Sequence, residues 1–194
     1  MIKNILNELR ISVIATVCLA VLLCGIYPAI VWGIAQGLFH SQANGSLVEV
    51  QGQVAGSSLL AQSFTGAGYF HPRPSAAGDG YDAVSSGGSN LGPTSQKLIA
   101  AVKERVAAYR AENNLAPEVL IPADAVTASA SGLDPHISVK NALLQASRVA
   151  GARGIGEEAL RKKILSHTEG RDLGIFGEPR VNVLMLNLDM DRKL

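Results

Sequence analysis

The sequence predicts a single transmembrane helix near the N-terminus, followed by one exported domain of the α+β class. Three observations lead to this prediction. Residues 11–48 contain no charged side chain; segments 94–113, 138–152 and 157–167 repeat apolar residues at helical spacing; and residues 181–188 form a short apolar run typical of a strand. Helices and strands that follow one another without regular alternation favour an α+β domain.

The membrane helix is predicted over residues 11–39. As an α-helix this segment would rise ~43 Å at ~1.5 Å per residue, against a hydrocarbon core of ~30 Å. A cleaved signal peptide is the alternative, but its apolar part usually covers only ~7–15 residues and ends in a small-residue cleavage site, which residues 35–37 match weakly. We therefore expect a retained anchor, with residues 1–10 before it, a connector over 40–56 and the domain over 57–194.

Positive charge flanks the predicted helix on one side only. Lys3 and Arg10 precede it, whereas the first Lys or Arg beyond it is Arg73. The positive-inside rule therefore places the N-terminus in the cytoplasm and the domain on the far side of the membrane. Both cysteines, Cys18 and Cys24, lie within the helix, so the exported domain has no thiol for a disulfide.

The predicted helix carries small residues at a regular interval. Gly25, Ala29, Gly33 and Gly37 recur every four residues. In lipid, helices gain nothing by hiding apolar surface, and close backbone approach along such a face drives their association. We expect this face to pack against another membrane helix and the remaining surface to contact the bilayer. The alternative is that Gly25 and Pro28 only mark a kink.

The start of the exported part is predicted to be irregular. Residues 44–46 read as a turn and 47–50 as a weak strand. Residues 56–93 are rich in Gly, Ser and Pro, yet they also contain aromatic side chains, which a flexible linker would lack. We therefore expect ordered loops held in place by these rings, which are Phe64, Tyr69, Phe70 and Tyr81.

Three helices and one strand are expected in the rest of the domain. Thr94 or Ser95 can cap the first helix, over residues 94–113. A loop over 126–136 leads to the second helix, the third follows a glycine-rich break, and residues 181–188 (VNVLMLNL) are the best strand candidate.

One polar residue interrupts the apolar face of the second helix. Ala142, Gln145, Ala146 and Val149 share that face by their spacing. Gln145 therefore occupies a position where an apolar side chain is expected.

The exported part contains no motif of a known catalytic or phosphate-binding site. A Walker A loop, a G-x-S-x-G elbow and an S-x-x-K pair are all missing from residues 40–194. His71 and His136, with loop serines, could still assemble a triad in space, so a membrane-tethered exported hydrolase is the alternative function. The four histidines lack the spacing of metal ligands, and we predict no metal site and no catalytic residue.

Charge gives no indication of a nucleic-acid partner. Of the 17 basic and 16 acidic residues, 15 of each sign remain once Lys3, Arg10 and Glu8 are set aside. A balanced domain without a basic patch has no electrostatic reason to bind nucleic acid.

Several short motifs occur in order along nearly the whole chain. The most specific are YFHPRPSA at 69–76, SGGSNL at 86–91 and VTASASGLD at 126–134, and Gln145 is followed by the Arg148 segment. Behind a single N-terminal helix, this order resembles the KdpC family, the C subunits of the Kdp high-affinity potassium-transporting P-type ATPases. Ala61, where that family pattern has Gly, is a small local departure.

The resemblance implies an accessory subunit that is not itself an enzyme. It would act in the bacterial inner (plasma) membrane, with its domain in the periplasm or outside the cell. Its implied partners are a channel-like potassium-translocating subunit and the P-type subunit that hydrolyses ATP, with a small single-helix subunit as a further candidate. The family is described as a catalytic chaperone that raises the ATP affinity of the hydrolysing subunit, and Gln145 matches the Gln proposed to contact the nucleotide.

The predicted orientation and this family description disagree about ATP. An exported domain faces the side of the membrane where ATP is scarce. We therefore favour Gln145 as a polar residue hydrogen-bonded inside the fold, with nucleotide contact as the alternative. ATP enters as a ligand only through the family description, and no other cofactor is expected.

Overall fold

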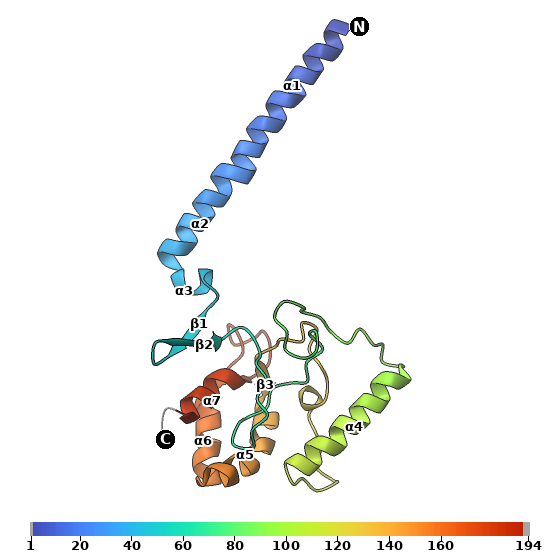
Figure 1. Ribbon diagram of the computed structural model, residues 1–194, viewed down its shortest axis with the longest axis vertical. Coiled ribbons are helices and arrows are strands. Elements are labelled where there is room, and N and C mark those ends of the chain that lie inside the picture. Colours follow the sequence, from blue (N-terminus) through green and yellow to red (C-terminus); the bar gives the residue numbers. More distant parts are fainter. Residues whose placement is uncertain (1, 192–194) are drawn as a thin grey trace. The chain divides into compact units, whose positions relative to one another are not determined.

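The computed structural model describes residues 2–191 and confirms an α+β chain with one apolar N-terminal helix (Figure 1). The chain divides into two compact units, Met1–Leu47 and Val48–Leu194. The division falls inside the predicted connector, residues 40–56, so the connector belongs partly to each unit.

The first unit consists of a long helix and a short one. The long helix comprises α1 (Ile2–Ala20), a π-helical turn η1 (Val21–Ile26) and α2 (Tyr27–Leu38). Within the described residues, one helix is long and apolar enough to cross a membrane; it covers Lys3–Leu38, and none of its residues is buried. Its 36 residues would rise ~54 Å.

Pro28 explains the π-helical turn. A proline has no N–H, and its ring displaces the carbonyl four residues earlier. The N–H of Tyr27 bonds to the carbonyl of Leu22, five residues earlier, so the turn contains one extra residue. Ala29, Gly33 and Gly37 lie in the regular helix α2, whereas Gly25 lies in the wider turn and is offset from the spacing of a regular α-helix.

The first unit ends in a corner. Phe39 leaves the helical conformation with φ −130°, and α3 (His40–Ala43) follows. The Asn44 side chain donates to the carbonyl of His40 (2.7 Å) and to Oε1 of Gln36 (3.1 Å). These two bonds connect the corner to the end of α2 and to the first residue of α3.

The predicted weak strand is confirmed, and it has an unpredicted partner. β1 (Leu47–Val50) pairs with β2 (Gln53–Ser57) in a two-stranded sheet. The two residues between them, Gln51 and Gly52, have φ of 52° and 77°. Two consecutive residues with positive φ match the tight turns that the twist of a hairpin favours.

The three predicted helices are present in the second unit. They are α4 (Gln96–Glu112), α5 (Val139–Arg153) and α6 (Glu157–Ser166). Ser95 caps α4 by accepting a hydrogen bond from the N–H of Leu98, and Ser138 caps α5 in the same way. A short 3-10 turn, η2 (Ala123–Ala125), lies between α4 and α5.

The prediction of a strand over residues 181–188 is wrong for most of its length. β5 (Arg180–Asn182) is a strand, but α7 (Val183–Asp191) follows at once. Asn182 starts this helix, because its Oδ1 accepts from the N–H of Met185. The buried residues fit a helix better than a strand: Val183, Leu186, Asn187 and Met190 recur at steps of three and four, and Leu184, also buried, lies three residues before Asn187.

A small antiparallel sheet links the loops to the helices. β5 is its central strand, with β3 (His136–Ser138) on one side and β4 (Thr168–Glu169) on the other. The main core packs α5, α6 and α7 around Phe70, which comes from the loop region. A second cluster joins α4 to η2 through Tyr109, Ala125 and Val126.

Candidate functional site

Gln145 is fully enclosed by the second unit and uses all its hydrogen-bonding groups there. It is 1% exposed and lies on α5 beside fully buried alanines and Val149. Its Oε1 accepts from the N–H of His71 (2.7 Å) and from Arg148 (2.8 Å). Its Nε2 donates to the carbonyl of His71 (3.1 Å) and to Oδ1 of Asn141 (2.9 Å).

Asn187 makes an equivalent pair of bonds to the preceding residue of the same loop. Its Oδ1 accepts from the N–H of Phe70, and its Nδ2 donates to the carbonyl of Phe70, both at 2.9 Å. Asn187 is 1% exposed and Phe70 is fully buried. Two side-chain amides from separate helices, Gln145 and Asn187, thus replace the backbone partner that a strand would give this loop.

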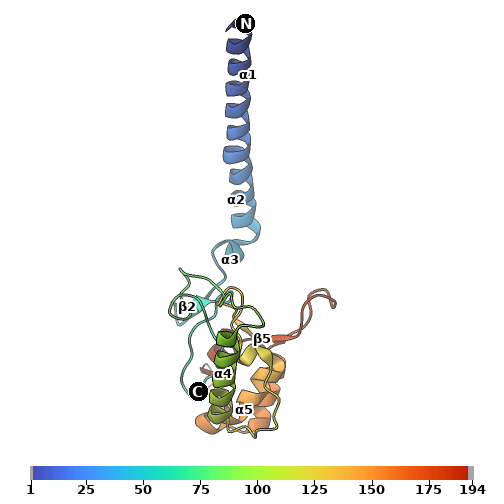
Figure 2. The same ribbon diagram turned by 90° about the vertical axis from the view of Figure 1, so that its right-hand side faces the viewer.

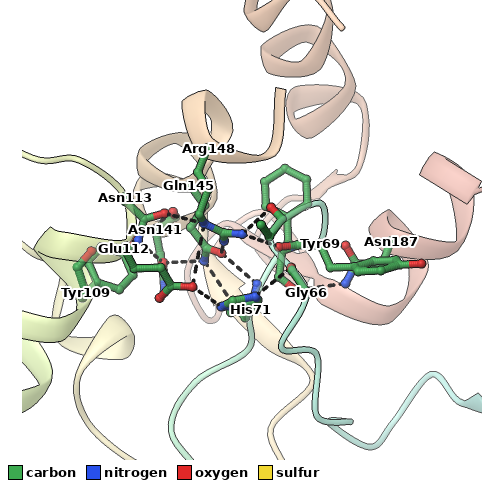
Figure 3. Close-up of polar contacts among 12 residues, drawn as sticks. Gly66, Tyr69, His71, Tyr109, Glu112, Asn113, Asn141, Gln145, Arg148 and Asn187 are labelled. Atoms are coloured by element: carbon green, nitrogen blue, oxygen red, sulfur yellow. Dashed lines mark hydrogen bonds and ion pairs between the residues drawn. The ribbon is translucent and has the colours of Figure 1, made fainter. Parts of the chain in front are cut away.

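A buried guanidinium group completes the attachment of the loop (Figure 3). Arg148 donates to the carbonyls of Ala67 (2.6 Å) and Tyr69 (3.0 Å), to Gln145, and to Oδ1 of Asn113 (3.0 Å) at the end of α4. Burial lowers the pKa of Arg148, and the nearby carboxylate of Glu112 opposes that shift. The guanidinium group of an arginine stays charged even when burial lowers its pKa, so the bonds of Arg148 to the carbonyls are charge-assisted.

A second set of polar contacts extends from Asn141 toward η2. The hydroxyl of Tyr109 donates to Oδ1 of Asn141 (2.7 Å). The Nδ2 of Asn141 in turn donates to Asp124 (2.9 Å). The backbone and hydroxyl of Ser138 also donate to Asp124. Burial and the charge of Asp124 raise the pKa of Tyr109, which keeps the phenol protonated as a donor.

His71 has both ring nitrogens engaged by oxygen acceptors. Nδ1 lies 2.7 Å from Oε1 of Glu112, and Nε2 lies 3.1 Å from the carbonyl of Gly66. A catalytic base needs a nitrogen that can accept a proton from a nucleophile. Among the contacts of residues 2–191, the His71 ring faces the carboxylate of Glu112 and the carbonyl of Gly66, and these contacts hold the loop.

His136 belongs to a different group of charges, on β3. Its Nδ1 lies 3.5 Å from Asp134 and its Nε2 lies 3.6 Å from Glu169. Arg73 donates to Asp134 at 2.8 Å. His136 is therefore placed between two carboxylates, and within the described chain neither ring nitrogen contacts a serine.

Asp134 makes the stability of the second unit depend on pH. Burial acts to raise its pKa, but hydrogen bonds from His136 and Arg73 outweigh burial and lower the pKa to about 2. The stabilisation is therefore complete above the unfolded pKa of 3.8 and is lost as the pH falls toward 2. Asp134 is partly exposed, and solvent screening reduces its contribution to about 1 kcal/mol.

We expect Asp134→Asn to lower the free energy of unfolding by about 1 kcal/mol at pH 7. The difference from the original chain should shrink as the pH falls through the range from 3.8 to about 2. Urea unfolding across a pH series measures this effect. A difference that stays constant down to pH 2 would contradict the assigned ionisation.

The space beside the Gln145 network is small. A cavity of about 150 Å³ is lined by His71, Pro72, Arg105, Ala108, Tyr109, Glu112, Ala125 and Gln145. Pockets for drug-sized ligands are usually ~300–1,000 Å³. The side chains of this network attach the loop around Phe70 and His71 to the three helices α4, α5 and α7. In residues 2–191 no cluster of three or more His, Cys, Asp or Glu could hold a metal ion.

Within residues 2–191, the glycines of the first unit have no packing partner. A Cβ added at Gly25, Gly33 or Gly37 would meet nothing within 4 Å. A shallow groove next to them is lined by Ala20, Val21, Cys24, Gly25, Ile26 and Ala29. The structure therefore leaves this side of the helix open.

Sequence reasoning found Gln145 but missed the residues that work with it. Asn187 falls in the stretch for which the sequence predicts a strand, and the sequence assigns no role to Arg148 or Asn141. One pattern in the sequence could have indicated Asn141: like Gln145, it lies at a position whose spacing turns it toward the inward face of α5. Nothing in the sequence indicated which loop atoms these amides would contact.

These features define a class: a single-helix membrane-associated protein whose α+β domain is organised by an internal polar network. The family described as "KdpC: K+-transporting ATPase, c chain" matches residues 9–192. The chain belongs to this KdpC family, which confirms the resemblance seen in its motifs.

Similar curated proteins match nearly end to end. The potassium-transporting ATPase KdpC subunit of Mycobacterium tuberculosis (strain ATCC 25618 / H37Rv) is 55% identical over 190 residues, covering 98% of each chain. That of Nitratidesulfovibrio vulgaris is 57% identical over 189 residues, covering 96% of this chain and 94% of the relative. That of Koribacter versatilis is 50% identical over 189 residues, covering 97% and 94%.

Proposed function

We propose that this chain is a non-catalytic accessory subunit of an ATP-driven high-affinity potassium uptake complex. The observation that carries the proposal is the KdpC family match over residues 9–192, which includes both the membrane helix and the domain. The similar proteins are named as subunits of a potassium-transporting ATPase. In this reading the chain supports assembly and stability of the complex, while other chains transport potassium and hydrolyse ATP.

The partners follow from this role. They are a channel-like potassium-translocating subunit and the P-type subunit that hydrolyses ATP, with a small single-helix subunit as a third candidate. The open small-residue side of the membrane helix supports direct contact with a partner helix, because those glycines pack against nothing else in the part of the chain that the structure describes.

The geometry of the histidines weighs against an exported hydrolase. His71 and His136 are each placed between oxygen acceptors, and within the described residues neither contacts a hydroxyl nucleophile. A serine hydrolase needs a nucleophile and base within hydrogen-bond reach.

Nucleotide contact by Gln145 stays a prediction from the family description. As Gln145 is placed, a nucleotide would have to displace at least one of its bonds to His71, Asn141 or Arg148. Such an exchange leaves a buried polar group without its partner unless the ligand replaces the bond. We favour a purely structural role for Gln145, with any effect on ATP affinity passing through the membrane helices.

We place the chain in the bacterial inner membrane, with the N-terminus in the cytoplasm and the domain outside. Lys3 and Arg10, which lie at the N-terminal end of the helix and precede its uncharged stretch 11–39, support this orientation. In sealed right-side-out vesicles, an added protease should therefore cleave the domain without any detergent. A cytoplasmic protein enclosed in the same vesicles is the control for leakage. Cleavage of the domain only after the membrane is opened would reverse the orientation and make contact with cytoplasmic ATP feasible.

A further inference from the structure

The segment between β4 and β5 forms a hairpin that projects from the second unit (Figure 2). Asp172 and Phe176 exchange two backbone hydrogen bonds, of 2.8 and 2.9 Å, at its end. Three large apolar side chains are exposed there: Leu173 at 88%, Ile175 at 73% and Phe176 at 63%. We call these three residues the apolar tip. They belong to neither of the two hydrophobic clusters.

Ion pairs brace the stem below the apolar tip. Arg171 donates to both carboxylate oxygens of Glu178, at 2.9 and 2.8 Å. Arg180 contacts Glu169 (3.0 Å) and Asp172 (3.3 Å). Exposed ion pairs add little to global stability. They do restrict the stem, and a preorganised element loses less conformational entropy when it binds.

The backbone at the tip is unusual for its sequence. Leu173 has φ of 54° and the next residue, Gly174, has φ of 75°. The left-handed conformation costs an L-residue with a Cβ roughly 1–2 kcal/mol, and Gly or Asn is the usual choice for such a turn. Because the Leu173 side chain is 88% exposed, burial within the domain does not offset this cost. The backbone hydrogen bonds of the hairpin hold this turn in the free chain, and a contact that buries the Leu173 side chain would add to them.

Two features of the hairpin favour a protein over a lipid surface as that molecule. Residues 169–180 carry three carboxylates and two guanidinium groups, which gives a net charge of −1. Peripheral membrane-binding elements instead combine apolar residues with excess Lys or Arg, which are attracted to anionic lipids. Asp172, next to Leu173, would also have to enter the headgroup region.

The size of the apolar tip favours a partner that is already bound elsewhere. Three side chains offer roughly a few hundred Å² of surface, whereas a stable independent interface buries ~1,600 Å² in total. The tip is therefore too small to hold a second copy of this chain by itself. It can add a local contact within a complex whose subunits are already tethered, where the effective concentration is high.

We propose that the apolar tip docks into an apolar pocket on the exported surface of another subunit of the same potassium-transporting ATPase. This inference rests on the proposed function, because it needs the complex to exist. It adds a partner-facing element in the exported domain to the contact made by the membrane helix.

Site-specific photocrosslinking in the assembled complex tests the docking. Phe176 is replaced by p-benzoylphenylalanine in the full chain, which is produced in membranes together with the other ATPase subunits and irradiated before purification. The control places the same photoreactive residue at Val84, an apolar residue that is 95% exposed outside the hairpin. Both positions lie outside the hydrophobic clusters, so neither replacement should unfold the domain.

The expected result is a covalent adduct between position 176 and an identified ATPase subunit, in clear excess over the adduct from position 84. Adducts only with lipid or with a second copy of the chain would overturn the docking, as would equal adducts from both positions. A complex that co-purifies without any adduct from position 176 would also overturn it, and would leave the proposed function intact. If no other subunit co-purifies with the unmodified chain, the proposed function fails as well.

Discussion

Replacing Gln145 by Leu should lower the free energy of unfolding of the second unit by about 3 kcal/mol. Leucine has a similar volume, so little cavity is created, but the N–H and carbonyl of His71 both lose their partner. Each unsatisfied buried polar group costs ~1–3 kcal/mol. Pulse proteolysis of the full chain across a urea series measures the change, because only the unfolded domain is cleaved.

A matched control separates the lost hydrogen bonds from a general effect of the substitution. Gln96→Leu makes the same chemical change on α4, where the side chain is exposed. Gln and Leu have similar helix propensities, so this variant should stay within ~0.5 kcal/mol of the original chain. Asn187→Leu should resemble Gln145→Leu, because it removes the equivalent pair of bonds to Phe70. Equal stability of Gln145→Leu and Gln96→Leu would contradict a stabilising role for the hydrogen bonds of Gln145 to His71.

Replacing both Gly33 and Gly37 by Leu should reduce co-purification of the chain with its partner subunits about tenfold or more. Both glycines face open space in the isolated chain, so the larger side chains would clash only with a neighbouring helix. Separating closely packed membrane helices removes the contacts that hold them together, and each tenfold loss corresponds to ~1.4 kcal/mol. Quantitative recovery of the other subunits in mild detergent provides the measurement.

The control for this pair is the double variant Gly33→Ala with Gly37→Ala. It removes the same two glycines from the helix but adds only one methyl group at each site. Helix propensity rises in both variants, so the difference between them reports side-chain size. Undiminished co-purification and potassium uptake with the leucine pair would show that this face is not the interface.

Much of the fold could be predicted from the spacing of apolar residues along the sequence. The helices around Leu98, Val149 and Leu160 could be predicted because apolar residues recur at steps of three and four, and Ser95 and Ser138 supply caps. The segment after Val181 failed because its apolar residues are nearly continuous, and such a run does not distinguish a strand from a buried helix.

The polar site was predictable only in part. The spacing of α5 placed Gln145 on an inward face, and an enclosed amide must find partners. The identity of those partners depends on which loop residue, Phe70 or His71, reaches each helix, and that contact joins residues more than 70 positions apart. The sequence also did not indicate that Asn182 caps α7. A cap is recognised only when the helix after it is predicted, and this segment was predicted to be a strand.

Purification of the tagged chain in mild detergent, with identification of every protein that accompanies it, tests the accessory-subunit role most directly. We predict recovery of the full-length chain, with its first forty or so residues retained, together with a channel-like potassium-translocating subunit and a P-type ATP-hydrolysing subunit. Recovery of the chain alone as a freely soluble protein without its N-terminal helix would contradict this account.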